Sequence, residues 1–306
     1  MKMKIGTRGS QLALWQAHYV ANHLQRHGVV AEIITIRTRG DQQQNVGIAD
    51  IGTRGVFTDA IEEQLRQGAI DLAVHSAKDL QSELGDEFEL IAFSERERMT
   101  DVLISSTPLG ELTPTRSWTI GTSSARRKAL LRHYYPHLNA VEMRGNLQTR
   151  IAKMKAGQCD ALMLAYAGVH RMEYDTLIRH EFPLAQWIPA VGQGSVAVES
   201  LRSLDEEKKE RVRRAINHPA TEQQLQAERA YLKALRGGCS IPVFALAQHQ
   251  ATGLRLRGGV VSLDGQRLVT DQVEGSAAEA ERVGQQLAQK ILDQGGKQIL
   301  DAIREG

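Results

Sequence analysis

Short apolar segments alternate with amphipathic segments through most of this chain, and this alternation restricts the fold more than any other feature. In the first third, strand-like runs occur at residues 2–7, 31–38 and 70–75. Helical patterns lie between them, over residues 10–28 and 56–67. Strands that alternate with helices in this way are typical of βαβ units. We therefore expect an α/β domain with a largely parallel sheet.

A second α/β pattern follows near residue 100. It consists of strands at 118–121, 140–143 and 160–165 and helices at 123–135 and 146–156. Residues 195–199 form a further β-branched run. We expect this last strand to return to the first domain, with the charged helix 205–217 behind it.

The last ninety residues have a different pattern. A capping box at Thr221 opens a helix that continues to Leu235, and strand-like runs follow at 243–248, 254–262 and 267–273. Residues 277–294 carry one apolar stripe, which predicts an amphipathic helix. The overall prediction is an α/β protein with two α/β domains and a smaller C-terminal α+β domain. The expected boundaries are 1–98 with 195–216, then 99–194, then 217–306.

Composition narrows the choice of partners. The formal charge is only +2 and aromatic residues are 5% of the chain, so neither a broad basic field nor a base-stacking surface for nucleic acid is indicated. The longest apolar stretch, 161–169, is too short to span a bilayer. The two cysteines cannot form a disulfide framework, and no Cys/His spacing typical of a metal site is present. We expect a cytoplasmic protein without nucleic-acid or membrane partners.

Arginines and hydroxyl residues gather where predicted strands end. These positions are the ligand-binding edge of open α/β sheets, and the helix N-termini there favour anions. Arg126 and Arg127 lie in the first turn of a helix, where their charge opposes the helix dipole, so we expect ligand carboxylates to compensate them. Guanidinium groups suit carboxylates, and the pattern predicts a polyanionic ligand. The residues concerned are Arg8, Ser10, Thr122, Ser124, Arg126, Arg127, Arg144, Gly145, Arg150 and Arg171.

One carboxylate and one thiol are candidates for a direct chemical role. Asp79 follows a buried strand and could bind a ligand N–H and stabilise a developing cation, or pair with Lys78 in a loop. His75 is interpreted as a core histidine with a satisfied hydrogen bond rather than a base. Cys239 follows two glycines, which leaves its sulfur accessible, whereas Cys159 is expected to be structural.

The segment 192–197 loosely matches a dinucleotide-binding fingerprint. That motif has to follow a strand and open a helix, but here it precedes a strand-like run. A nicotinamide oxidoreductase is therefore disfavoured.

Six short motifs, in order and spread over the whole chain, resemble the porphobilinogen deaminase (hydroxymethylbilane synthase) family. The matching stretches are GTRGSQLALWQA (6–17), AVHSAKD (73–79), GTSSARR (121–127), RGNLQTR (144–150), PAVGQG (189–194) and GGCSIP (237–242). Several motifs at consistent separations are far more specific than any one of them.

This resemblance implies two domains like those of periplasmic binding proteins and a third that carries Cys239. Cys239 would hold a dipyrromethane cofactor through a thioether, and the enzyme, a transferase, would join four porphobilinogen molecules to it. Asp79 would bind pyrrole N–H groups and steady cationic intermediates. The resemblance also implies a monomer that needs no metal. Cofactor binding would involve Cys239, Lys78, Ser76, Asp79, Thr122, Ser124, Arg126, Arg127, Arg144 and Gly145, and substrate binding Arg8, Ser10, Arg144, Arg150, Arg171 and Gln193.

The polar, glycine-rich segment 41–55 is expected to be a mobile lid. It differs from the family pattern, because Asp50 and Arg54 stand where lysines are usual. The main alternative function is a non-catalytic module that binds polyanions on the same scaffold. Such a module would need neither Asp79 nor Cys239.

Overall fold

The computed structural model describes residues 1–38, 58–238 and 240–305. Cys239 and the expected lid at 41–55 lie outside these residues. The chain divides into two compact units, one made of residues 1–97 and 192–222 and the other of residues 98–191 and 223–306. Each unit is described by itself.

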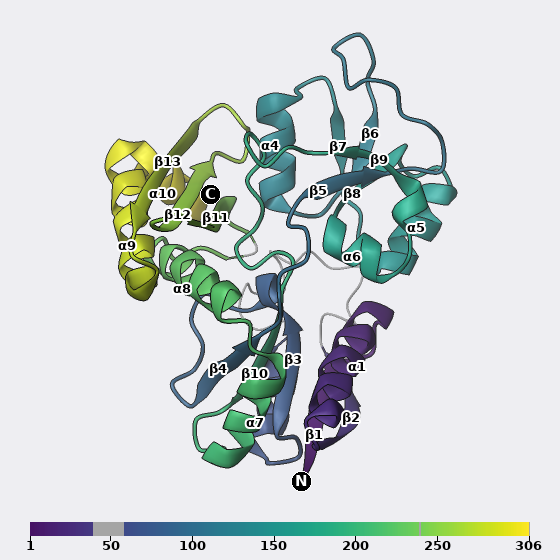
Figure 1. The fold of residues 1–306 in the computed structure, drawn as a ribbon. Coiled ribbons are helices and arrows are strands. Elements are labelled where there is room, and N and C mark those ends of the chain that lie inside the picture. Colours follow the sequence, from purple (N-terminus) through teal and green to yellow (C-terminus); the bar gives the residue numbers. More distant parts are fainter. Residues whose placement is uncertain (39–57, 239, 306) are drawn as a thin grey trace. The chain divides into compact units, whose positions relative to one another are not determined.

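Unit 1 is built on a five-stranded sheet of order β2-β1-β3-β10-β4 (Figure 1). The strand β1 pairs in parallel with both β2 and β3, whereas β10 is antiparallel to β3 and β4. The return of a late strand to the first sheet is thus confirmed, with β10 between β3 and β4. The elements are β1 (Lys2–Arg8), α1 (Gln11–Arg26), β2 (Val30–Ile36), α3 (Asp59–Arg66), β3 (Leu72–Ser76), η1 (Ala77–Asp79), β4 (Phe88–Phe93), β10 (Val196–Leu201) and α7 (Glu206–Ile216).

Unit 2 contains a second five-stranded sheet, of order β7-β6-β8-β5-β9. Here β6 is parallel to β7 and β8, and β5 is antiparallel to β8 and β9, so this sheet repeats the arrangement of the first. The elements are β5 (Asp101–Ile104), β6 (Thr119–Gly121), α4 (Ala125–Tyr134), β7 (Asn139–Val141), α5 (Leu147–Lys155), β8 (Ala161–Ala165), α6 (Tyr166–Arg171), η2 (Asp175–Leu177) and β9 (Ile178–Glu181).

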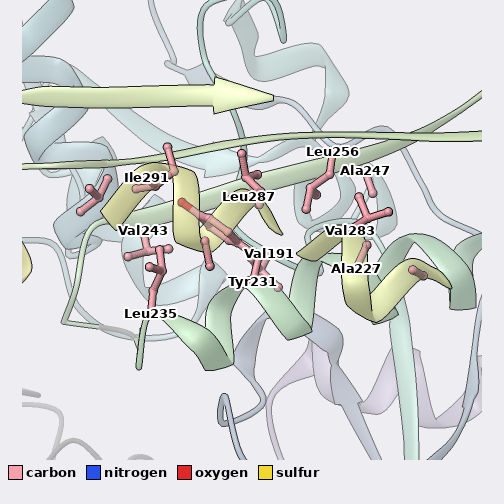
Figure 2. Packing of buried hydrophobic residues seen from close by; sticks show 14 of the residues in the cluster. Val191, Ala227, Tyr231, Leu235, Val243, Ala247, Leu256, Val283, Leu287 and Ile291 are labelled. Carbon is pink, nitrogen blue, oxygen red and sulfur yellow. The ribbon is translucent and has the colours of Figure 1, made fainter. Parts of the chain in front are cut away.

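The C-terminal part of unit 2 is an antiparallel sheet of order β11-β12-β13, covered by helices on one face. Its core packs residues of α8 and α9 against the sheet, including Tyr231, Leu256 and Leu287 (Figure 2). The mixed α/β and α+β class is therefore confirmed. The elements are α8 (Pro219–Ala234), β11 (Val243–Gln250), β12 (Gly253–Val261), β13 (Leu268–Gly275), η3 (Ala277–Glu279), α9 (Ala280–Ile291), η4 (Leu292–Gly296) and α10 (Lys297–Glu305).

The three-domain boundaries stay a prediction. Phe244 and Leu246 of β11 belong to the same apolar cluster as Leu103 and Trp187. This shared core joins the three-stranded sheet to the second α/β sheet within unit 2. No helix in the described ranges is both long enough and apolar enough to cross a membrane.

Candidate functional site

The carboxyl edge of the unit 1 sheet gathers several of the predicted residues. Because β1 and β3 are parallel neighbours, Arg8 and Ser76, which end these strands, lie at the same edge. Ser10 caps α1, its side chain accepting a hydrogen bond from the Ala13 N–H at 3.3 Å. The Gln16 amide of the same helix donates to the Ser76 hydroxyl at 2.7 Å. The helix thus fixes the end of β3.

Asp79 follows this edge in the short helix η1. Its side chain is exposed. Among the described residues, neither a hydrogen bond nor an ion pair holds its carboxylate, so the alternative pairing with Lys78 is not formed. The carboxylate is therefore free to accept a donor from a ligand.

A tight turn at residues 192–194 packs against the backbone of η1. Gly192 has φ +76°, and a Cβ there would lie 2.8 Å from the Ala77 carbonyl carbon and 2.9 Å from the Lys78 nitrogen. Gln193 is fully buried, and its carbonyl accepts a hydrogen bond from Arg96 Nε at 2.8 Å. The turn leads into β10 rather than a helix, which removes the structural context that a dinucleotide fingerprint needs.

Replacing Gly192 with alanine is expected to destabilise the protein and to lower its activity. Gly28 has the same φ of +76° but open space around its Cβ position, so Gly28→Ala is a matched control. Both variants carry the left-handed strain of about 1–2 kcal/mol. Only Gly192→Ala also pushes on the backbone before Asp79, which adds at least about 1 kcal/mol. Urea unfolding and turnover assays measure both effects, and equal losses in the two variants would contradict the positioning role.

At the carboxyl edge of the unit 2 sheet, parallel strands are again followed by helices with side-chain caps. Because β6, β7 and β8 are parallel, the segments that follow them share one edge. The Ser124 side chain caps α4, and Asn146 caps α5 by accepting the Thr149 N–H at 2.9 Å. Thr122, Ser124, Arg144 and Gly145 follow β6 and β7 at this edge, Arg150 lies in α5, and Arg171 ends α6, the helix that follows β8.

The arginines of this edge are partly engaged within the chain. Arg144 Nε contacts Glu142 Oε1 at 3.1 Å, and Glu142 also pairs with Lys128. Arg150 Nε donates to the Gly145 carbonyl at 2.7 Å, which fixes the turn at Gly145. Both guanidinium groups are half-buried. These contacts within the chain hold both side chains in place.

Arg126 and Arg127 correct one expectation. We predicted that ligand carboxylates compensate them, but both are buried against Asp101, which is fully buried. Asp101 Oδ1 accepts from Arg127 Nε and Nη2 at 3.1 and 2.6 Å, and Oδ2 accepts from Arg126 Nη2 at 2.7 Å. The Trp187 indole N–H also donates to Oδ2, at 2.8 Å. The chain itself therefore supplies a counter-charge. The two arginines remain predicted cofactor ligands because their cluster keeps a net positive charge.

One carboxylate cannot neutralise two guanidinium groups, so this cluster keeps a net positive charge. Arg126 Nε is buried and has no hydrogen-bond partner among the described residues. Burial alone would raise the pKa of Asp101, but the charges of Arg126 and Arg127 outweigh it and hold that pKa well below its usual range. Sequence reasoning missed Asp101 and Trp187. The one available signal was the acid at the head of the apolar run 101–104.

Replacing Asp101 with asparagine is expected to lower the free energy of unfolding by about 3–5 kcal/mol, because two buried cations lose their counter-charge. The folded pKa of Asp101 is depressed. Its contribution to stability is thus present above the unfolded pKa of about 3.9 and lost as pH falls through the folded value. Denaturant titrations at pH 7 and below pH 4 measure the difference. The exposed Glu111→Gln serves as control, and an equally small loss in both variants would contradict the role of Asp101.

Two interpretations of single residues agree with the structure. His75 is buried and its Nε2 lies 3.0 Å from Glu199 Oε2, as expected for a core histidine with a satisfied hydrogen bond. Cys159 is buried in the apolar cluster beside Met143 and Leu162, and burial raises the pKa of its thiol. In the described ranges no group of three His, Cys, Asp or Glu side chains could hold a metal ion.

The fold and these two edges define an α/β protein whose strand ends present arginine, hydroxyl and carboxylate side chains. A family model described as "Porphobilinogen deaminase, dipyromethane cofactor binding domain" matches residues 3–210, and the C-terminal domain of the same family matches residues 223–293. The chain belongs to the porphobilinogen deaminase family.

Curated relatives cover the whole chain. The porphobilinogen deaminase of Desulfosudis oleivorans is 51% identical over 100% of this chain and 99% of its own length. That of Cytophaga hutchinsonii is 50% identical over 99% of this chain and 97% of its own. Among solved structures, the periplasmic VFT2 domain of Bordetella pertussis BvgS matches 70% of this chain and 86% of its own, at 16% identity and a TM-score of 0.41.

Proposed function

We propose that this chain is a porphobilinogen deaminase. It joins four porphobilinogen molecules, one at a time, to a covalently bound dipyrromethane and releases ammonia at each step. Hydrolysis then frees linear hydroxymethylbilane for tetrapyrrole biosynthesis. The observation that carries the proposal is the match to relatives of that name over the full chain, at up to 51% identity.

The donor set fits the dipyrromethane cofactor. Its two pyrroles each bring two carboxylates, and carboxylates are the natural partners of arginine. The Asp101 cluster has a net positive charge, and Arg126 Nε is buried without a hydrogen-bond partner among the described residues, so both suit an anionic group. Cys239 anchors the cofactor, which supplies the free pyrrole position to which the first substrate is joined. The residues that hold it are Ser76, Lys78, Asp79, Thr122, Ser124, Arg126, Arg127, Arg144 and Gly145.

Asp79 carries the catalytic role. Its exposed carboxylate accepts a pyrrole N–H and offsets the positive charge that develops on porphobilinogen as ammonia leaves. The end of β3 and the turn at 192–194, which packs against Ala77 and Lys78, hold the backbone that leads to Asp79 and so position its carboxylate. Preorganised charge of this kind lowers the barrier without reorganisation during the reaction.

The remaining cationic and hydroxyl groups bind substrate. Each added porphobilinogen brings two more carboxylates, so the growing chain accumulates negative charge. A protein with a formal charge of only +2 can hold such a chain only where its cations are concentrated. The substrate-binding residues are Arg8, Ser10, Arg144, Arg150, Arg171 and Gln193.

The protein acts as a monomer in the cytoplasm, with neither nucleic acid nor membrane as a partner. The near-neutral charge supports the part of this proposal that concerns nucleic acid and membrane. The usual reducing conditions of that compartment keep a single reactive thiol available.

An assay of the purified holoenzyme with porphobilinogen tests the function. Ammonia release and hydroxymethylbilane, separated by chromatography, are the readouts, with about four ammonia molecules expected per product. A module that only binds polyanions would bind porphobilinogen without releasing ammonia. That outcome would overturn the proposal.

A further inference from the structure

A small pocket lies where the three-stranded sheet meets the second α/β sheet, inside unit 2. Its volume is about 220 Å³, and it is lined by residues of α4, the segment 185–188, β12 and β13. The lining includes Tyr134, Ala185, Ile188, Arg257 and Gln272. None of these residues belongs to the candidate site described above.

Two hydrogen-bond donors face this pocket from different elements. Arg257 on β12 is half-buried and uses Nη2 to donate to the Ala185 carbonyl at 2.6 Å. Tyr134, at the end of α4, packs its ring near Trp187, and its hydroxyl makes no hydrogen bond with any described residue. The pocket therefore holds a guanidinium with further N–H groups and a phenol O–H to donate.

The positive charge here is not balanced by an acid. Arg255 lies two residues before Arg257, so both side chains lie on the same face of β12. Neither arginine forms an ion pair with a described residue, and Arg255 Nε is buried without a partner. Burial and the charge of Arg255 both lower the pKa of Arg257, as expected for a cation that lacks an anion.

The two nearby acids, Asp271 and Glu274, are not partners of Arg257. Asp271, which also lines the pocket, accepts from Gln294 Nε2 at 2.6 Å and lies 3.5 Å from Lys290 Nζ. Glu274 is the cross-strand neighbour of Arg255, whereas Arg257 faces the neutral Gln272. An anion in the pocket would thus meet Arg257 with little competition.

We propose that this pocket binds a small oxyanion, a carboxylate or a phosphate, between the Arg257 guanidinium and the Tyr134 hydroxyl. The anion bridges α4 and β12 through these two side chains. Binding to the folded state alone raises stability by mass action. The site is independent of the deaminase reaction and is tested without it.

The test measures thermal unfolding of the holoprotein with increasing inorganic phosphate in one series and acetate in the other, at constant ionic strength set with chloride. The series that raises Tm with saturation identifies the preferred oxyanion. Arg257→Gln is expected to weaken the affinity at least about tenfold, as for one charge-assisted hydrogen bond. Tyr134→Phe weakens it less, and Arg257→Lys retains part of it because the charge remains.

Arg267→Gln, an exposed change of the same charge in the turn before β13, is the control and should bind like the parent. Anion binding by the arginines of the candidate site is common to parent and variants and cancels in the comparison. If Arg257→Gln does not fold, Tyr134→Phe decides, since it keeps both the ring and the charge. Equal saturation in the parent, Arg257→Gln and Tyr134→Phe, or no saturable rise with either anion, would overturn the proposal.

Discussion

Replacing Asp79 with asparagine is expected to lower the turnover number by at least about a hundredfold, as for the loss of one preorganised electrostatic group. The amide keeps the shape and an acceptor oxygen but not the charge. A residue that only bound substrate would raise KM with turnover unchanged. We expect the opposite, with turnover reduced and KM nearly constant, because the carboxylate acts on charge that develops in the transition state.

Asp86→Asn is the matched control, since Asp86 is another exposed aspartate of unit 1 outside the site edge. Asp79→Glu is expected to retain part of the activity because the charge survives while its position shifts. Steady-state kinetics with porphobilinogen measures all three variants. Parent-like turnover in Asp79→Asn would remove the catalytic assignment.

The sequence predicted the parallel part of each sheet because those strands carry clear signals. The run at 160–165 is short and largely apolar, and the run at 2–7 alternates charged and apolar residues before the helix cap Ser10. Three strands were not predicted: β4 and β5, although their sequences are apolar, and β9, which lacks such a signal. β9 contains Arg179, His180 and Glu181, and it is an edge strand with one free side. A polar composition of this kind is typical of edges, and it hides the strand from a search for apolar runs.

The C-terminal helix α10 was missed for a similar local reason. Gly295 and Gly296 predict the end of a helix, and Gly295 does adopt φ +105°. The chain nevertheless resumes a helix at Lys297, because Ile299 and Leu300 are buried in the core of the three-stranded sheet. Tertiary packing decided where local propensity indicated a stop.

The sequence predicted the positions of those candidate site residues that directly follow strands. Motif positions placed Arg144, Gly145 and Arg150 at one edge, and the parallel pairing of β6 with β7 and β8 brings that edge together. The partner of Arg126 and Arg127 could not be predicted. Asp101 precedes them by some 25 residues and reaches them only because β5 enters the sheet beside β8. Helix-dipole reasoning correctly required an anion but could not say that the chain supplies it.

Replacing Cys239 with alanine is expected to abolish both the covalent cofactor and the activity. The parent should exceed its sequence mass by one dipyrromethane, and intact-protein mass spectrometry should find that increment missing in Cys239→Ala. The reason is chemical, because alanine has no sulfur from which a thioether can form. No other described thiol can replace it. Cys159 is 5% exposed, and burial raises the pKa of its thiol, which keeps it neutral and unreactive.

Cys159→Ala is the matched control, with the same atoms removed from the other cysteine. It should keep the mass increment and most of the turnover, at a cost in stability from the small cavity left in its apolar cluster. An unmodified parent that turns over porphobilinogen, or a Cys239→Ala protein that keeps the increment, would show that the primer is attached elsewhere or is not needed. Loss of the increment in Cys239→Ala alone ties the covalent chemistry to that one sulfur, and the arginine edges then serve to hold the chain that grows from it.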